Sequence, residues 1–227
     1  GPKASGPIKV GAPYIDYATG LNAAFAVMAA LRERDRTDQH QIVDVAMLDT
    51  ALNLMANNVV TIANTGVDLP KLGNEAASRA PSSGCFETQD GGLIMLAANN
   101  ERQFKDLCIV LGHEEWFIDP RWNSPMVRTE NQETLRQELI AVFLTKPAQD
   151  WEVMLDRAGV PSSRVRTLKE VISEGQPEAR SSLGELKVGD AEVPTRLPAI
   201  GFRLNGDSLR PERPPRKVGE DNKRYLS

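Results

Sequence analysis

The sequence contains little cysteine, few aromatic residues and no long hydrophobic run. Its two cysteines, Cys85 and Cys108, are too widely spaced for a metal knuckle and too few for a disulfide framework, although a single disulfide stays open. No apolar run reaches the roughly 18 residues that a membrane helix needs, and the start shows no secretory signal. We therefore expect a cytoplasmic protein with no membrane partner.

An excess of positive charge is also absent. The chain has 27 Lys and Arg against 31 Asp and Glu, which gives a net charge of −4. Because the phosphates of nucleic acids call for a basic face, we expect no nucleic-acid partner. The sequence also lacks a phosphate-binding glycine loop, a Ser-His-Asp spacing and a zinc motif, so we predict no metal site. The 41% hydrophobic content and the length of 227 residues are ordinary for a globular protein of one or two domains.

The first third of the chain predicts a helix, a strand and a second helix. Residues 17–31 are apolar nearly all round, which predicts a helix buried on most sides. The polar residues 32–41 predict a solvated turn, and the β-branched run 42–48 predicts a buried strand. Asp49 is predicted to open the second helix, which ends near Gly66. This order is typical of an α/β layer. Because only one strand is evident, we interpret this part as a piece of a larger domain.

The middle of the chain predicts a compact α+β domain. A stretch rich in Gly, Pro, Ser and Ala at 67–84 indicates a linker or an active-site loop. Two short apolar runs flank Asp90-Gly91-Gly92, which predicts a β-hairpin over 85–98. Helices are predicted over three ranges that follow, namely 100–112, 128–145 and 147–159. Beyond Pro177 the sequence predicts only short strands, around residues 185–188 and 200–204.

Asp16, in the stretch GAPYIDYATG, has two compatible interpretations. An aspartate directly before a helix-forming run is a normal N-cap, worth about 1 kcal/mol. A carboxylate at a helix N-terminus is also kept ionised by the helix dipole and the free amides, and an ionised, positioned carboxylate can act as a covalent nucleophile. The residues alone favour the cap. His40 and His113 lie in polar turns and are interpreted as surface residues, and the two cysteines as packed ones.

The order of several motifs resembles the family III CoA-transferases, also called the CaiB/BaiF family. The resemblance starts with GAPYIDYATG, an alanine-rich helix and VDVAMLD. It continues through APSSGCFETQDGGLIMLAA, DPRW, DWEVMLDRAGVPSSRV and PPRKVGEDNKRYL. These motifs extend over nearly the whole chain in the family's order.

The resemblance implies site residues and a mechanism. The family's catalytic aspartate corresponds to Asp16, and a family position beside bound CoA corresponds to Met47. Ser82, Ser83 and Gly84 stand where a glycine-run loop shields the intermediates in the family, and we predict that they contact CoA. Coenzyme A and acyl-CoA would be substrates, with a carboxylic acid as the second partner and no permanently bound cofactor. The implied reaction is covalent transfer through an aspartyl thioester on Asp16.

The resemblance also implies an α/β fold. It is made of part of a Rossmann-like large domain and a smaller α+β domain. On this basis residues 1–72 form the central part of the large domain and carry Asp16. Residues 73–175 form the small domain, and residues 176–227 return toward the large domain. Family members are about twice as long and form homodimers, so we expect a homodimer and predict that this stretch alone is inactive.

Two alternatives stay open. In an α-methylacyl-CoA racemase or epimerase of the same family, the aspartate would act as an acid or base on the α-carbon. DYATG is more similar to the transferase form than to the glycine-rich form of the racemases. The second alternative is a truncated, non-catalytic association domain.

Overall fold

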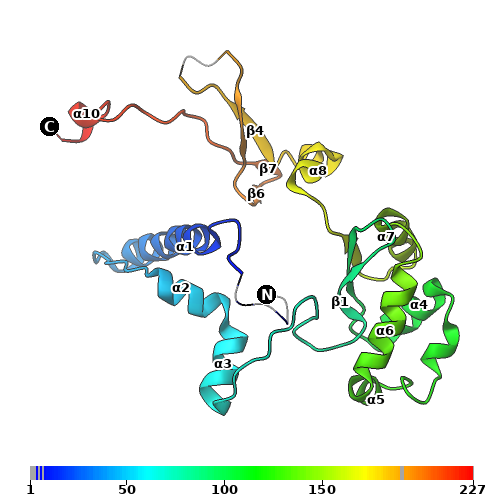
Figure 1. Ribbon diagram of the computed structural model, residues 1–227. Coiled ribbons are helices and arrows are strands. Elements are labelled where there is room, and N and C mark those ends of the chain that lie inside the picture. The colour runs from blue at the N-terminus through cyan, green and yellow to red at the C-terminus, as the bar shows by residue number, and fades with distance from the viewer. Residues whose placement is uncertain (1–3, 5, 7, 190–191, 227) are drawn as a thin grey trace. The chain divides into compact units, whose positions relative to one another are not determined.

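A computed structural model describes the chain except for residues 1–3, 5, 7, 190–191 and 227 (Figure 1). The chain divides into two compact units, residues 1–163 and 164–227, and each is described by itself. The domain boundaries expected at residues 72 and 175 stay a prediction.

Three helices make up the first part of the chain. They are α1 (Tyr14–Thr37), α2 (Met47–Leu54) and α3 (Ala56–Thr65). Helix α1 continues six residues beyond the predicted end at Leu31, so the predicted turn at residues 32–41 is wrong up to Thr37. Arg36 pairs with Glu33 one turn earlier at 2.6 Å, and the Thr37 hydroxyl donates to the Glu33 carbonyl. These contacts and good helix-forming residues extend the helix until Asp38 adopts the left-handed conformation.

The predicted strand at 42–48 is not formed. Residues 41–46 have no regular structure, and Met47 rather than Asp49 begins α2. A strand exists only where its backbone groups pair with a neighbouring strand. In the described part of the chain, no strand lies beside these residues. The single helix predicted from Asp49 onward is two helices, α2 and α3, which meet at Met55. Its predicted end near Gly66 is confirmed, since Gly66 ends α3 in the left-handed conformation.

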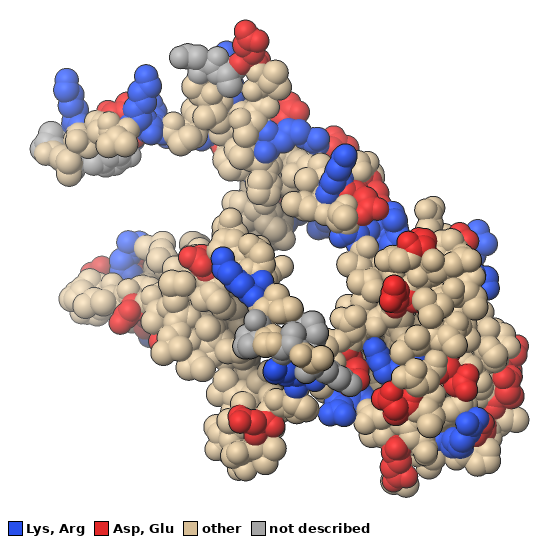
Figure 2. All heavy atoms as spheres, viewed as in Figure 1, with Lys and Arg blue, Asp and Glu red and all other residues tan. Residues whose placement is uncertain are grey.

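The helix predicted over residues 17–31 is formed, but its apolar faces are exposed in the described chain. Helix α1 contains no buried residue, and its Phe25 side chain is 74% exposed. Burial requires a second apolar surface, and α2 is the described element that packs against α1. Figure 2 shows fewer charged side chains on the visible face of α1–α3 than on the part formed by residues 83–160.

The predicted hairpin is confirmed. Strand β1 (Ser83–Glu87) pairs antiparallel with β2 (Leu93–Ala97), with Phe86 opposite Ile94, and β3 (Ser162–Arg164) adds to the other side of β2. The Asp90 carboxylate stabilises the turn because it accepts hydrogen bonds from the Thr88 hydroxyl at 2.6 Å and the Gly92 amide at 3.2 Å.

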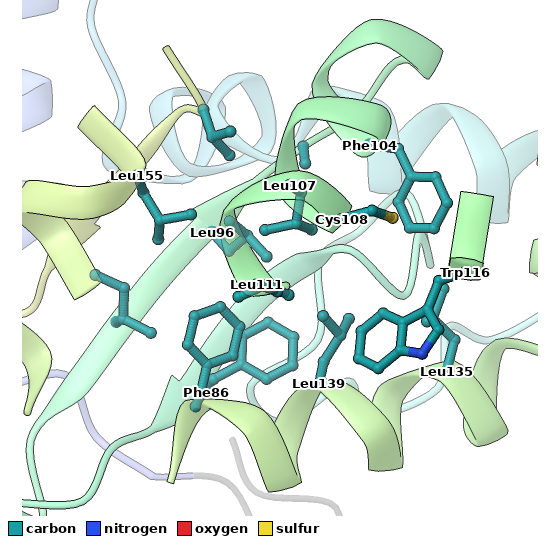
Figure 3. Close-up of a cluster of buried hydrophobic side chains, with 14 of the residues drawn as sticks. Phe86, Leu96, Phe104, Leu107, Cys108, Leu111, Trp116, Leu135, Leu139 and Leu155 are labelled. Carbon is teal, nitrogen blue, oxygen red and sulfur yellow. The ribbon is translucent and has the colours of Figure 1, made fainter. Parts of the chain in front are cut away.

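Four α-helices and one 3₁₀-helix cover this sheet. They are α4 (Glu101–Leu111), the 3₁₀-helix η1 (Glu114–Phe117), α5 (Pro125–Glu130), α6 (Gln132–Phe143) and α7 (Ala148–Arg157). The helix predicted over 128–145 is therefore two helices that meet at Asn131. Figure 3 shows Phe86, Leu107, Leu111 and Leu139 pointing toward one another in the core between strands and helices. The region 83–160 thus has its own hydrophobic core and is called the small domain below.

The second unit contains short elements. They are α8 (Leu168–Ser173), α9 (Gly175–Ala179), β4 (Leu183–Leu186), β5 (Thr195–Pro198), β6 (Arg203–Leu204), β7 (Asp207–Ser208) and α10 (Asn222–Tyr225). Strand β4 pairs antiparallel with β5, and β6 with β7. The short strands predicted near residues 185–188 and 200–204 overlap β4 and β6.

Candidate active site

Asp16 is the third residue of α1 and is not its N-cap. The N-cap is Pro13, and no side chain caps this helix end. The Tyr17 amide donates to the Pro13 carbonyl at 3.2 Å, so the helix starts three residues earlier than an Asp16 cap would require. The cap interpretation is therefore wrong. A carboxylate in the first turn still lies at the positive end of the helix dipole.

The Asp16 carboxylate is exposed and uncommitted. Among the described residues it has no hydrogen-bond or ion-pair partner. Two other first-turn carboxylates are engaged, since Glu101 of α4 pairs with Arg128 and Glu170 of α8 completes a capping box with Thr167. Asp49 of α2, by contrast, is exposed like Asp16. A nucleophile must be accessible to an external electrophile, and the exposed Asp16 carboxylate meets this requirement.

Met47, the second predicted site residue, is the first residue of α2. Its side chain is 50% exposed and offers an apolar, polarizable surface. Helices α1 and α2 pack together, so Asp16 and Met47 stand on two elements in contact. One side-chain hydrogen bond connects the helices in the described chain, from Asn22 Nδ2 to Thr50 Oγ1 at 3.3 Å. Sequence reasoning missed this pair.

Ser82, Ser83 and Gly84 lie at the start of β1 and are buried. The Ser82 hydroxyl donates to the Ala98 carbonyl at 2.7 Å, and the Ser83 hydroxyl donates to Asn99 Oδ1 at 2.6 Å. Both hydroxyls therefore connect the start of β1 to the end of β2. Within the described residues, no hydrogen bond or ion pair connects these three residues to Asp16 or Met47. The predicted contact with CoA stays a prediction.

Gly84 permits a close backbone approach. Its φ of +128° is one that residues with side chains rarely adopt, and an added Cβ would lie 2.5 Å from the Asn74 carbonyl oxygen. That oxygen accepts a hydrogen bond from the Cys85 amide at 2.8 Å, and Glu75 forms a bridge with Gly84. The loop before β1 is thus anchored to the strand at residues 74 and 75.

A cavity of about 280 Å³ lies beside Ser82. It is lined by Ala80, Pro81, Ser82, Ala98, Asn99, Asn100, Glu101, Phe104, Pro125, Arg128 and Thr129. Arg128 is 6% exposed, donates to the Trp122 carbonyl at 2.6 Å, pairs with Glu101 and stacks on the Phe104 ring. Burial lowers the pKa of Arg128. Through these contacts Arg128 fastens α5 to α4.

The described residues contain no group of three or more His, Cys, Asp or Glu side chains placed to hold a metal ion. Nor does any helix in the described ranges combine the length and apolar character needed to cross a membrane.

Comparison with known proteins gives consistent results. The sequence profile of the family described as CoA-transferase family III matches residues 1–222. The chain is similar to an acyl-CoA transferase of Fusarium pseudograminearum, with 29% identity over 92% of this chain and 45% of the relative. It is 32% identical to succinyl-CoA–D-citramalate CoA-transferase of Chloroflexus aurantiacus, over 80% of this chain and 47% of the relative.

A solved structure shares the fold. The crystal structure of Rv3272 from M. tuberculosis matches with a TM-score of 0.84 and 26% identity, over 99% of this chain and 59% of that one. The chain spans about half the length of the curated relatives it matches. The fold predicted from the motif resemblance is confirmed, and the family profile extends over nearly every residue. The chain therefore belongs to CoA-transferase family III.

Proposed function

We propose that this chain supplies the catalytic aspartate of a CoA-transferase, which moves CoA between an acyl-CoA thioester and a carboxylic acid. Membership of CoA-transferase family III supports the reaction class. The observation that carries the assignment to Asp16 is its exposed carboxylate in the first turn of α1, which no described residue binds.

The proposed reaction proceeds through covalent intermediates on Asp16. A carboxylate oxygen of Asp16 attacks the carbonyl carbon of the donor thioester, and the C–S bond breaks, which releases CoA as a thiolate and forms a mixed anhydride on Asp16. The thiolate attacks the Asp16 carbonyl, releases the donor acid and forms an aspartyl thioester. The acceptor carboxylate then displaces CoA, and the thiolate attacks the acceptor's carbonyl in the new anhydride. This last step forms the product thioester and restores the Asp16 carboxylate. Each step is an acyl transfer with a good leaving group.

Other parts of the chain support this chemistry. In this proposal Met47 lines an apolar wall beside the thioester, and Ser82, Ser83 and Gly84 shield the intermediates from water. The exposed apolar surfaces of α1 and α2 pack against the rest of the protein, since exposed patches above a few hundred Å² mark interaction surfaces. We therefore expect a homodimer of the whole protein and an inactive chain when residues 1–227 stand alone.

The central experiment traps the intermediate in the active protein that contains this chain. Incubation with the donor acyl-CoA, followed by hydroxylamine or borohydride, should modify Asp16, as read by peptide mass spectrometry. Asp16→Asn should remove nearly all turnover because an amide does not attack a thioester. Asp49→Asn is the matched control, since Asp49 is also an exposed aspartate in the first turn of its helix. Turnover without modification of Asp16 would disprove the covalent role.

The acid substrate can be tested with a small panel. A relative in Chloroflexus aurantiacus is named succinyl-CoA–D-citramalate CoA-transferase, and one in Agrobacterium fabrum is named succinate–glutarate CoA-transferase. We therefore propose small dicarboxylic acids as acceptors and succinyl-CoA as the first donor to test. Monocarboxylic acids of equal chain length are the comparison in the same assay.

A further inference from the structure

Thr50 differs from every other residue of the three N-terminal helices. Throughout α1, α2 and α3, all of which the structure describes, Thr50 is the only buried residue, and it is 4% exposed. Apolar neighbours on the same helix stay in contact with solvent, including Leu48 and Leu54. Burial of a hydroxyl is unfavourable unless a hydrogen bond compensates for the lost water. The position of a threonine at this contact therefore calls for an explanation beyond hydrophobic packing.

The compensating hydrogen bond comes from α1. Asn22 Nδ2 donates to Thr50 Oγ1 at 3.3 Å, which joins two residues 28 positions apart in the chain. The connection between the helices, residues 38–46, has no regular structure. Apolar contact is non-directional and tolerates sliding, whereas a hydrogen bond requires a narrow range of distances and angles. The Asn22–Thr50 contact therefore fixes the alignment of the two helices.

Both partners lie close in sequence to the candidate site residues. Asn22 follows Asp16 by six residues, which corresponds to about 9 Å along a helix axis, and Thr50 follows Met47 by about one helical turn. A shift or rotation of α1 against α2 would move the Asp16 carboxylate relative to the Met47 side chain.

We propose that Asn22 and Thr50 are positioning residues, which hold the helix of the Asp16 nucleophile in register with the helix of Met47. This inference rests on the function proposed above. Neither residue needs to contact the substrate, because they act through the alignment of α1 and α2. Misplacement of a reacting group by about 1 Å can reduce a rate roughly 100-fold, so loss of the contact should lower kcat and leave KM nearly unchanged.

Two substitutions at Thr50 separate positioning from packing. Thr50→Val keeps the branched shape and removes the acceptor, whereas Thr50→Ser keeps the acceptor and removes a methyl group. If Thr50 serves packing alone, valine should be tolerated and serine should be harmful. If it positions α1, valine should be harmful and serine should restore function. Thr61→Val is the matched control, since Thr61 is an exposed threonine of α3 that bonds only within its own helix.

The first measurement is hydrogen exchange of the backbone amides in α1 and α2, made on the 227-residue chain. A typical net hydrogen-bond contribution predicts about five-fold faster exchange in these helices for Thr50→Val. Exchange in α4–α7 should not change. Asn22→Ala should reproduce the effect from an exposed position, and the double variant should be no worse than either single variant.

The second measurement is the rate of acyl transfer to Asp16 in the active protein that contains this chain. Thr50→Val should reduce kcat by about 10- to 100-fold with little change in KM, and Thr50→Ser should retain most of the rate. Normal exchange and normal kcat in Thr50→Val would overturn the proposal, as would damage confined to Thr50→Ser. Absence of any Asp16 adduct in the unsubstituted protein would instead refute the proposed function. The exchange experiment would still decide whether the Asn22–Thr50 contact aligns the helices.

Discussion

Replacement of Gly84 by alanine tests how the loop of residues 74–80 is held against the small domain. The backbone of Gly84 has a φ of +128°, and its missing side chain leaves room for the Asn74 carbonyl oxygen. A methyl group there would lie 2.5 Å from that oxygen and 3.3 Å from the Glu75 Cα. Because both neighbours are backbone atoms, they cannot turn aside as a flexible side chain would.

Two costs add up at this position. An alanine held at such a φ is strained by about 1–3 kcal/mol, and overpacking of a close contact costs about 1–3 kcal/mol more. We therefore expect Gly84→Ala to lower the free energy of unfolding by about 3 kcal/mol or to displace residues 74–76. Gly91→Ala is the matched control. Gly91 has a φ of +71° with open space around it, so its strain alone should cost about 1 kcal/mol.

Urea unfolding followed by tryptophan fluorescence measures these costs. The three tryptophans, Trp116, Trp122 and Trp151, all lie in the small domain and are buried there. With a slope of about 2 kcal/mol per molar urea, the midpoint should fall by about 1.5 M for Gly84→Ala and by about 0.5 M for Gly91→Ala. Trypsin should also cut faster after Arg79 in the first variant, because the loop loses its anchor. Equal midpoints for the two variants would refute the argument from close approach.

Three further predictions concern stability and reaction type. Burial raises the pKa of the Cys108 thiol to about 12, whereas the unfolded thiol ionises near 9. The unfolded state therefore binds fewer protons between these values, and stability should fall by about 1.4 kcal/mol per pH unit above pH 9. Urea midpoints from pH 8 to 10.5 should show this fall, and Cys108→Ala should flatten it. Arg128→Met should cost about 2–3 kcal/mol in the same assay at neutral pH because it removes one partner of a buried contact. Glu101→Gln should cost less, since Glu101 is half exposed. Finally, a chiral 2-methylacyl-CoA in deuterated water should keep its α-proton during CoA transfer. Fast exchange without an acceptor acid would favour the racemase alternative.

Local sequence signals were sufficient to predict much of the secondary structure of the small domain. Asp90-Gly91-Gly92 predicted the hairpin, because its turn is stabilised by a neighbouring side chain and a left-handed glycine. Helix α4 begins where the Asn100 side chain accepts from the Gln103 amide, and it ends at Gly112 with a φ of +76°. These interactions join residues a few positions apart, so the sequence order contains the information that forms them.

The candidate site depended partly on motif order. The first motifs of the family resemblance contain Asp16 and Met47. The family itself is confirmed. The prediction that Asp16 is the N-cap was wrong, because the N-cap of α1 is Pro13 and the helix begins before Asp16. The ligand role of Ser82–Gly84 stays a prediction, since hydroxyl partners such as Ala98 and Asn99 follow only from strand pairing.

The sequence by itself determined the family, the hairpin and the ends of α4 and α7 to within two residues. It did not determine the break between α5 and α6 at Asn131. The tertiary structure alone decided burial and long-range pairing. Residues 42–48 are apolar enough for a strand but have no strand partner in the described chain, and α1 is apolar but exposed. The contact of Asn22 with Thr50 likewise exists only because α1 and α2 pack together. The polarity of a side chain indicates whether it can be buried or can form hydrogen bonds. Which residue it actually contacts depends on segments that are distant in the chain.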